Sequence, residues 1–147
     1  MTQTPQGVLL SQQKFTRELL RDCGLTIKRQ ASTLLSINCK LLPGEGDLLE
    51  DPTTYRTLVG KLNFLTNTRP DLSFTVQTLS QFLQNPRTSH LQALIHILSY
   101  IQSPANQGIL LKGTNQLKLQ AFSDSDWAAC PNSRRSIIGY LILLGTS

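Results

Sequence analysis

The sequence has little of what marks membrane-spanning or extracellular proteins. Its longest uninterrupted apolar run is five residues, 140–144, whereas a membrane-spanning helix needs roughly 18 or more. The first six residues are polar and uncharged, and no apolar region of the length found in signal peptides follows them, so no secretory signal peptide is predicted. The three cysteines are odd in number and share no metal-ligand spacing. They favour reduced thiols in an intracellular protein, and we expect no membrane partner.

Charged side chains are also sparse. They make up 16% of the 147 residues, and hydrophobic residues make up 39%, a balance typical of a folded domain rather than a disordered tail. The 14 Lys and Arg exceed the 9 Asp and Glu, which gives a net charge of +5, but this excess is spread along the chain. A spread excess favours solubility as much as phosphate binding, so composition alone does not choose between them.

The N-terminal segment predicts a short strand followed by a helix. Residues 7–10 form the strand, Ser11 is the predicted N-cap of the helix, and Gly24 supplies its C-terminal stop. The apolar residues of the helix recur every four positions and are Phe15, Leu19 and Cys23. This spacing predicts one buried side.

Three basic residues share the other side of this predicted helix. Lys14, Arg17 and Arg21 fall within about 60° of one another, because each residue turns a helix by roughly 100°. The stripe could track a phosphate backbone, or it could be an ordinary solvated face, which the nearby Glu18 and Asp22 favour. Both interpretations stay open at this point.

A linker and three helices are predicted in the middle of the chain. Helical periodicity is lost between residues 26 and 50, where a turn-rich, acidic run at 43–47 is typical of a linker. Asp51, followed by a proline, and Thr88 are the predicted N-caps of the first and third helices. The residues that end or separate the helices are Arg69-Pro70-Asp71, Asn85-Pro86 and Pro104. The apolar residues at helical spacing are Tyr55, Leu58, Val59, Leu62 and Leu65, then Leu72, Val76, Leu79 and Leu83, then Leu91, Leu94, Ile95, Leu98 and Ile101.

After Pro104 the pattern changes to that of strands. The runs at residues 108–111, 117–122 and 139–144 are short and apolar, and they predict a β-hairpin. A hairpin without further strands is marginal in water. The segment therefore predicts the opening of a larger domain.

The one arrangement with chemical content is Phe122-Ser123-Asp124-Ser125-Asp126-Trp127. A carboxylate at the end of a strand can hold Mg²⁺, which prefers several oxygen ligands, although Asp and Ser after a strand are commoner as turn formers. The aromatic residues Phe122, Trp127 and Tyr140 could stack on nucleic-acid bases. Packing in a core is the role we predict for them.

Several strings occur in an order that is specific in combination. They are Gly7-Val8-Leu9-Leu10-Ser11-Gln12-Gln13-Lys14-Phe15, Tyr55-Arg56-Thr57-Leu58-Val59-Gly60-Lys61-Leu62, Thr66-Asn67-Thr68-Arg69-Pro70-Asp71-Leu72-Ser73-Phe74, Leu79-Ser80-Gln81-Phe82, and Phe122-Ser123-Asp124-Ser125-Asp126-Trp127-Ala128 followed by Pro131, Ser133-Arg134-Arg135-Ser136 and Gly139-Tyr140. In this order they closely resemble the copia-type retrotransposon polyprotein over nearly the whole chain.

The resemblance implies the C-terminal part of reverse transcriptase running into the start of ribonuclease H. The implied segments are a primer-grip-like strand and thumb helix at 1–27, a linker at 28–50, a helical thumb and connection region at 51–104, and a truncated start of a ribonuclease H-like domain at 105–147. The implied partner is an RNA–DNA hybrid or a primer–template duplex, with Lys14, Arg17 and Arg21 as the nucleic-acid-binding residues.

The resemblance also implies a metal ligand. Asp124 matches the first of the four carboxylates with which ribonuclease H holds two Mg²⁺ ions, whereas Asp126 is interpreted as a turn residue. The polymerase Tyr-x-Asp-Asp turn would lie before Met1, and the other three carboxylates beyond Ser147. We therefore expect Mg²⁺ as the cofactor of the parent enzyme, with no productive metal binding and no catalysis by this chain alone.

The predicted fold class is α+β, with a strand and helix, a linker, a three-helix region and an incomplete ribonuclease H-like β-hairpin. The implied parent function is RNA-directed DNA synthesis with degradation of the RNA strand. Two alternatives remain open. One is a nucleic-acid-binding module without catalysis, and the other is an inert helical remnant whose apolar faces once packed on the missing polymerase core.

Overall fold

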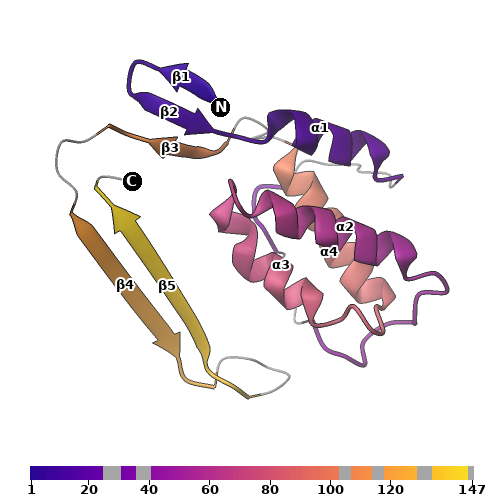
Figure 1. The fold of residues 1–147 in the computed structure, drawn as a ribbon. Coiled ribbons are helices and arrows are strands. Elements are labelled where there is room, and N and C mark those ends of the chain that lie inside the picture. The colour runs from indigo at the N-terminus through magenta and orange to yellow at the C-terminus, as the bar shows by residue number, and fades with distance from the viewer. Residues whose placement is uncertain (25–30, 36–40, 103–106, 114–117, 129–133, 146–147) are drawn as a thin grey trace. The chain divides into compact units, whose positions relative to one another are not determined.

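The fold is mixed α/β, as a computed structural model of the chain shows (Figure 1). The structure describes residues 1–24, 31–35, 41–102, 107–113, 118–128 and 134–145. Within these residues there are four α-helices, one short 3-10 helix and two small antiparallel sheets. The chain divides into two compact units, Ser11–Gly108 on one hand and Met1–Leu10 with Ile109–Ser147 on the other. None of the helices in the described residues is long and apolar enough to cross a membrane.

The unit Ser11–Gly108 holds every described helix. These are α1 Gln13–Asp22, α2 Thr53–Leu65, the 3-10 helix η1 Pro70–Leu72, α3 Ser73–Ser80 and α4 Thr88–Ile101. They share one core, in which Leu62, Leu94 and Leu98 are completely buried. Burying a leucine side chain contributes about 1.5–3 kcal/mol, so these contacts hold the helices together.

The periodic residues predicted for α2 are all buried, and so are those that lie within η1 and α3. In α4 the predicted residues Leu94, Leu98 and Ile101 are buried and Leu91 and Ile95 are partly buried. The helix predicted to carry Leu72 to Leu83 is shorter in the structure. It ends at Ser80, so Leu83 lies in the turn that follows α3.

The structure corrects all three predicted N-caps. Ser11 does not cap α1, whose N-cap residue is Gln12 and which has no side-chain cap bond. Thr88 is the first residue of α4 and follows the N-cap residue Arg87, and its hydroxyl accepts a hydrogen bond from the Asp47 backbone N–H at 3.2 Å. Asp51 lies one residue before the N-cap of α2, which is Pro52, and its Oδ1 accepts a hydrogen bond from the Thr53 backbone N–H at 2.8 Å.

The part of the predicted linker around residues 41–50 packs against the start of α4. Leu41 is buried in the core. The Arg87 guanidinium donates hydrogen bonds to the carbonyls of Pro43 and Gly46, at 2.8 and 2.7 Å. An isolated β-bridge joins Leu48 to Arg87. These bonds attach the loop to the helical unit.

In the other unit, a three-stranded sheet has the order β1-β2-β3, with β1 Thr2–Thr4, β2 Gly7–Leu10 and β3 Ile109–Leu111. The strand predicted at residues 7–10 is therefore confirmed. Gly7 has a φ of +145°, and a Cβ atom there would collide with the Leu111 carbonyl oxygen. Only glycine fits this approach of β3 to β2.

A second sheet is the antiparallel ribbon of β4 Leu119–Asp126 and β5 Ile137–Leu144. Of the three predicted strand runs, those at 117–122 and 139–144 fall largely in this ribbon, whereas the run at 108–111 pairs with β2 in the other sheet. Leu117 lies outside the described residues. The prediction that Phe122, Trp127 and Tyr140 pack in a core is wrong, because they are 55%, 93% and 80% exposed. A ribbon of two strands has no second layer of its own to cover such side chains.

Candidate nucleic-acid interface

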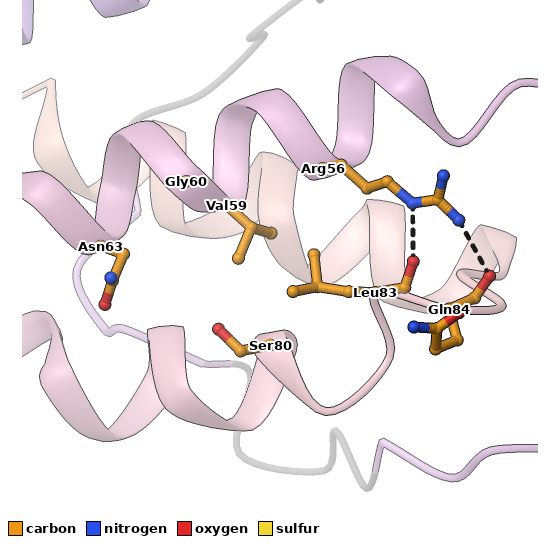
Figure 2. Close-up of a pocket in the computed structure, with 7 residues that line it drawn as sticks. All are labelled: Arg56, Val59, Gly60, Asn63, Ser80, Leu83 and Gln84. Atoms are coloured by element: carbon orange, nitrogen blue, oxygen red, sulfur yellow. Dashed lines mark hydrogen bonds between the residues drawn. The ribbon is translucent and has the colours of Figure 1, made fainter.

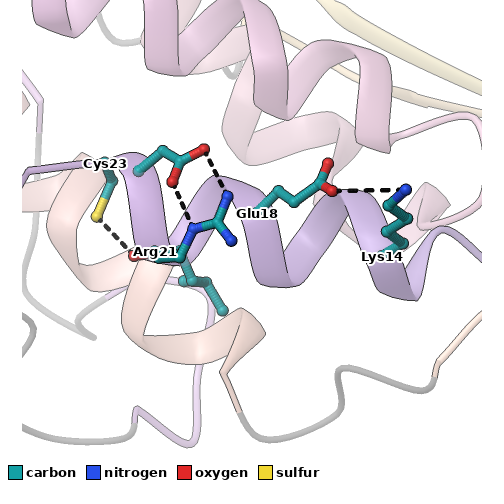
Figure 3. Close-up of polar contacts among 6 residues, drawn as sticks. Lys14, Glu18, Arg21 and Cys23 are labelled. Carbon is teal, nitrogen blue, oxygen red and sulfur yellow. Dashed lines mark hydrogen bonds and ion pairs between the residues drawn. The ribbon is translucent and has the colours of Figure 1, made fainter.

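Helix α1 presents the three predicted basic residues to solvent. The Lys14 side chain is 91% exposed and its Nζ lies 3.9 Å from Glu18 Oε1 (Figure 3). Arg21 donates two hydrogen bonds to Asp22, at 2.7 and 3.4 Å, which hold the pKa of that carboxyl below its usual value. Arg17 is exposed, and its side chain makes no hydrogen bond or ion pair with any other described residue.

The two ion pairs leave this basic surface available. Exposed pairs contribute about 0–1 kcal/mol, so a phosphate can displace Glu18 from Lys14 at little cost. Arg17 needs no displacement at all. Lys14, Arg17 and Arg21 therefore define the α1 basic surface, and among them the Arg17 side chain has no ion pair with another described residue.

The opposite side of α1 fixes the orientation of this surface. Leu19 is 1% exposed and Thr16 4%, so both sit in the core. The Phe15 ring meets Phe64 of α2 edge to face at 5.1 Å. These contacts keep the α1 basic surface turned away from the core.

A shallow groove between α2 and α3 was not foreseen from the sequence (Figure 2). Its volume is about 450 Å³, and it is lined by Arg56, Val59, Gly60, Asn63, Ser80, Leu83 and Gln84. The Arg56 guanidinium crosses one end of the groove and donates hydrogen bonds to the carbonyls of Leu83 at 2.8 Å and Gln84 at 3.1 Å. Arg56 thereby satisfies carbonyls in the turn after α3 and places a positive charge at the end of the groove.

Gly60 lies in the middle of α2, where close packing does not require a glycine. A Cβ atom built there would have no heavy atom within 4 Å, although a mid-helix glycine costs about 1 kcal/mol relative to alanine. Arg56, Gly60 and Phe64 are spaced four residues apart and so follow one line along the helix, and Phe64 is 53% exposed. We call these three residues the α2 row. It combines a cation, an uncovered backbone and an aromatic ring, and the glycine inside an apolar helical pattern was its only sequence signal.

Asp124 lies in the β4–β5 ribbon, two residues before the end of the exposed strand β4. Its cross-strand partner is Gly139, and Asp126 is the last residue of β4 rather than part of a turn. In the part of the chain that the structure describes, no three His, Cys, Asp or Glu side chains gather as a metal site would require.

Over nearly its whole length the chain is similar to Pol polyproteins of plant transposons. It is 42% identical over 141 residues to the retrovirus-related Pol polyprotein from transposon RE1 of Arabidopsis thaliana, covering 96% of this chain and 10% of that polyprotein. It is 29% identical over 147 residues to the one from transposon TNT 1-94 of Nicotiana tabacum, covering 94% of this chain and 11% of that polyprotein. The chain thus spans about a tenth of the length of these relatives.

These similarities make the chain a homologue of retrovirus-related Pol polyproteins from transposons. Within that class it belongs to the same family as an uncharacterized mitochondrial protein of Arabidopsis thaliana, to which it is 47% identical over 81 residues, 55% of this chain and 73% of that protein. The resemblance drawn from the motifs is confirmed at this level. No protein-family profile matches the chain, and no solved structure matches it.

Proposed function

We propose that the chain corresponds to the C-terminal part of a reverse transcriptase and the first strands of a ribonuclease H, and that its helical unit holds a nucleic-acid duplex. The observation that carries the proposal is the 42% identity to a Pol polyprotein over 96% of the chain. The order of the sequence motifs supports this region within that polyprotein. The partner would be an RNA–DNA hybrid or a primer–template duplex.

The α1 basic surface supports this function by its chemistry. Phosphate contacts come mainly from lysine and arginine side chains, and they give affinity without sequence preference. Arg17 is exposed without a partner among the described residues, and Lys14 and Arg21 are held only by exposed pairs. A duplex lying along α1 would gain these cations at little cost.

The α2 row adds a second kind of contact. A glycine lets a ligand approach the helix backbone closely, and an exposed aromatic ring offers a flat apolar surface. Arg56 contributes charge at one end, although two of its donors are already used by Leu83 and Gln84. The α2 row therefore fits close approach of a sugar–phosphate backbone to Gly60.

The test removes one positive charge at each of two positions and compares the effects on nucleic-acid affinity. The affinity of the whole chain for a fluorescently labelled RNA–DNA hybrid is measured by anisotropy over a range of salt concentrations. We expect Arg17→Gln to weaken binding severalfold and to reduce the salt slope by about one. Glu18→Gln is expected to strengthen binding, because it releases Lys14.

The matched control is Lys118→Gln, which removes the same charge from an exposed residue outside the helical unit. Its affinity should stay close to that of the unchanged chain. Equal losses for Arg17→Gln and Lys118→Gln would show an effect of net charge alone and would count against the α1 basic surface.

For Asp124 we propose membership of the metal site of the longer polyprotein. Mg²⁺ prefers several oxygen ligands, and of the described carboxylates only Asp126 shares the face of the ribbon on which Asp124 lies. This pair does not make a two-metal site by itself, so we derive no metal-dependent step. Asp124→Asn should leave the affinity for the hybrid unchanged with or without Mg²⁺. Mg²⁺-dependent cleavage of the hybrid that Asp124→Asn abolishes would overturn this account.

A further inference from the structure

The groove between α2 and α3 has polar ends and an apolar middle. From one end to the other its side chains are Asn63 and Ser80, then Val59 and Leu83, then Arg56 and Gln84 (Figure 2). Its volume of about 450 Å³ falls within the range of ligand sites, about 300–1,000 Å³, which also combine apolar walls with a few polar groups. We call it the α2–α3 groove.

The end of the groove at Asn63 and Ser80 holds unused hydrogen-bonding groups. Ser80 Oγ donates its hydrogen to the Val76 carbonyl oxygen at 2.8 Å, so towards a ligand it acts as an acceptor. The Asn63 side-chain amide makes no hydrogen bond with any other described residue, so its N–H donors are available. This end of the groove therefore offers an acceptor from α3 and a donor from α2.

The other end of the groove offers a positive charge. Arg56 uses its Nε and Nη2 to bond the carbonyls of Leu83 and Gln84, and its Nη1 makes no hydrogen bond with the residues that the structure describes. Asn63 follows Arg56 by seven residues, about 10 Å along the helix, and one strand of a duplex advances about 3.4 Å per nucleotide. The two ends therefore match a strand that runs along α2, with a phosphate at Arg56 and a sugar about three nucleotides away at Asn63.

We propose that the α2–α3 groove receives the RNA strand of the hybrid and distinguishes it from DNA by a ribose 2′-hydroxyl, an inference that rests on the proposed function. A 2′-hydroxyl is both a donor and an acceptor, so it donates to Ser80 Oγ and accepts from the Asn63 amide. Deoxyribose leaves both groups without a partner in the interface, which lowers the affinity. Phosphate contacts from the α1 basic surface are the same for RNA and DNA, so this discrimination belongs to the groove.

The experiment compares an RNA–DNA hybrid with a DNA duplex of the same sequence, by fluorescence anisotropy with the whole chain at one salt concentration. We expect the hybrid to bind about two- to tenfold more tightly, which corresponds to roughly one hydrogen bond. A hybrid whose RNA strand carries 2′-fluoro groups keeps the shape of the RNA strand but has no hydroxyl to donate to Ser80, and it should bind like the DNA duplex. A preference that survives the 2′-fluoro substitution would show recognition of duplex shape and would overturn the proposal.

Ser80→Ala removes the acceptor, and we expect it to abolish the preference while leaving the affinity for the DNA duplex unchanged. Asn63→Ala removes the donor and should have the same effect. The matched control is Ser99→Ala. Ser99 Oγ makes the same kind of bond within α4, to the Ile95 carbonyl at 2.8 Å, and lies outside the residues that line the groove, so this variant should keep the full preference.

Two results would overturn the inference and leave the proposed function standing. One is salt-dependent binding of the hybrid and the DNA duplex with equal affinity, and the other is an equal effect of Ser80→Ala and Ser99→Ala on the preference. No binding to either duplex would instead contradict the proposed function, and this inference with it.

Discussion

His90 is a buried histidine whose hydrogen bonds define its protonation state. Its Nδ1 accepts the Arg87 backbone N–H at 3.0 Å, and its Nε2 lies 3.1 Å from the Leu42 carbonyl oxygen. The ring therefore carries its proton on Nε2 and is neutral. It stacks on Phe82 with ring centroids 3.9 Å apart. One imidazole thus joins the start of α4, the loop before α2 and the turn after α3.

This environment predicts how stability depends on pH. Burial lowers the pKa of His90, with Arg87 lowering it further and Glu45 and the Leu42 carbonyl opposing the shift. The unfolded chain therefore binds a proton at higher pH than the folded chain, starting near the ordinary histidine pKa of about 6.5. We expect the free energy of unfolding to be constant well above the ordinary histidine pKa of about 6.5 and to fall as the pH decreases below it. Urea unfolding followed by circular dichroism measures it.

The control for this prediction is His90→Asn, whose side-chain oxygen can also accept the Arg87 N–H but does not titrate. Its stability should show a smaller step in the same pH window. The pKa of the Asp71 carboxyl is held below its usual value by hydrogen bonds from Arg69, so its own contribution is lost at more acidic pH. An equal step in both proteins would mean that another group titrates.

Replacing Gly60 by alanine is expected to raise stability and to weaken nucleic-acid binding. Because a Cβ atom there has no heavy atom within 4 Å, Gly60→Ala should raise the free energy of unfolding by about 0.5–1 kcal/mol through helix propensity. If the α2 row approaches nucleic acid as proposed, the same variant should bind the RNA–DNA hybrid more weakly. Unfolding and anisotropy measurements on one preparation separate the two effects. A variant that is more stable and binds equally well would remove Gly60 from the interface.

At the scale of elements, helices were predictable and long-range pairing was not. α2 and α4 were foreseen because their apolar residues repeat at helical spacing and because Asp51 and the prolines mark boundaries. The pairing of β2 with β3 joins segments about a hundred residues apart, such as Val8 with Leu111. No local pattern encodes such a contact, since it depends on how the whole chain closes.

Arg69 shows the same limit at a helix boundary. The sequence predicted only a break there, yet Arg69 is 3% exposed and donates hydrogen bonds to Asp71 at 2.9 and 2.7 Å. Its guanidinium also lies 5.6 Å from the centre of the Tyr100 ring. Burial of an arginine depends on partners from another helix, which a sequence pattern does not place. The α2 row was missed for a related reason, because its groove forms only when α2 and α3 pack together.

The three-stranded sheet predicts a difference between two glycines. Gly7 has a positive φ, and a Cβ atom there would collide with the Leu111 carbonyl, whereas Gly113 has open space around it. We expect Gly7→Ala to destabilise the sheet by about 1–3 kcal/mol and to increase hydrogen exchange in β2 and β3. Gly113→Ala is the matched control and should leave that exchange unchanged. Equal protection in the two variants would contradict the close approach of β3 to β2.

At the scale of the whole molecule, the net charge of +5 takes on a more definite meaning. The helical unit contains both the α1 basic surface and the α2 row, and the chain is homologous to transposon Pol polyproteins along almost its full length. We interpret the positive charge of this unit as part of a surface for a nucleic-acid duplex.

The most direct test of the central claim is the salt dependence of binding between the whole, unchanged chain and an RNA–DNA hybrid. The account predicts measurable binding at low salt that weakens linearly on a double-logarithmic plot as salt rises, because cations on phosphates release counterions. No binding at low salt, or an affinity that does not respond to salt, would contradict it.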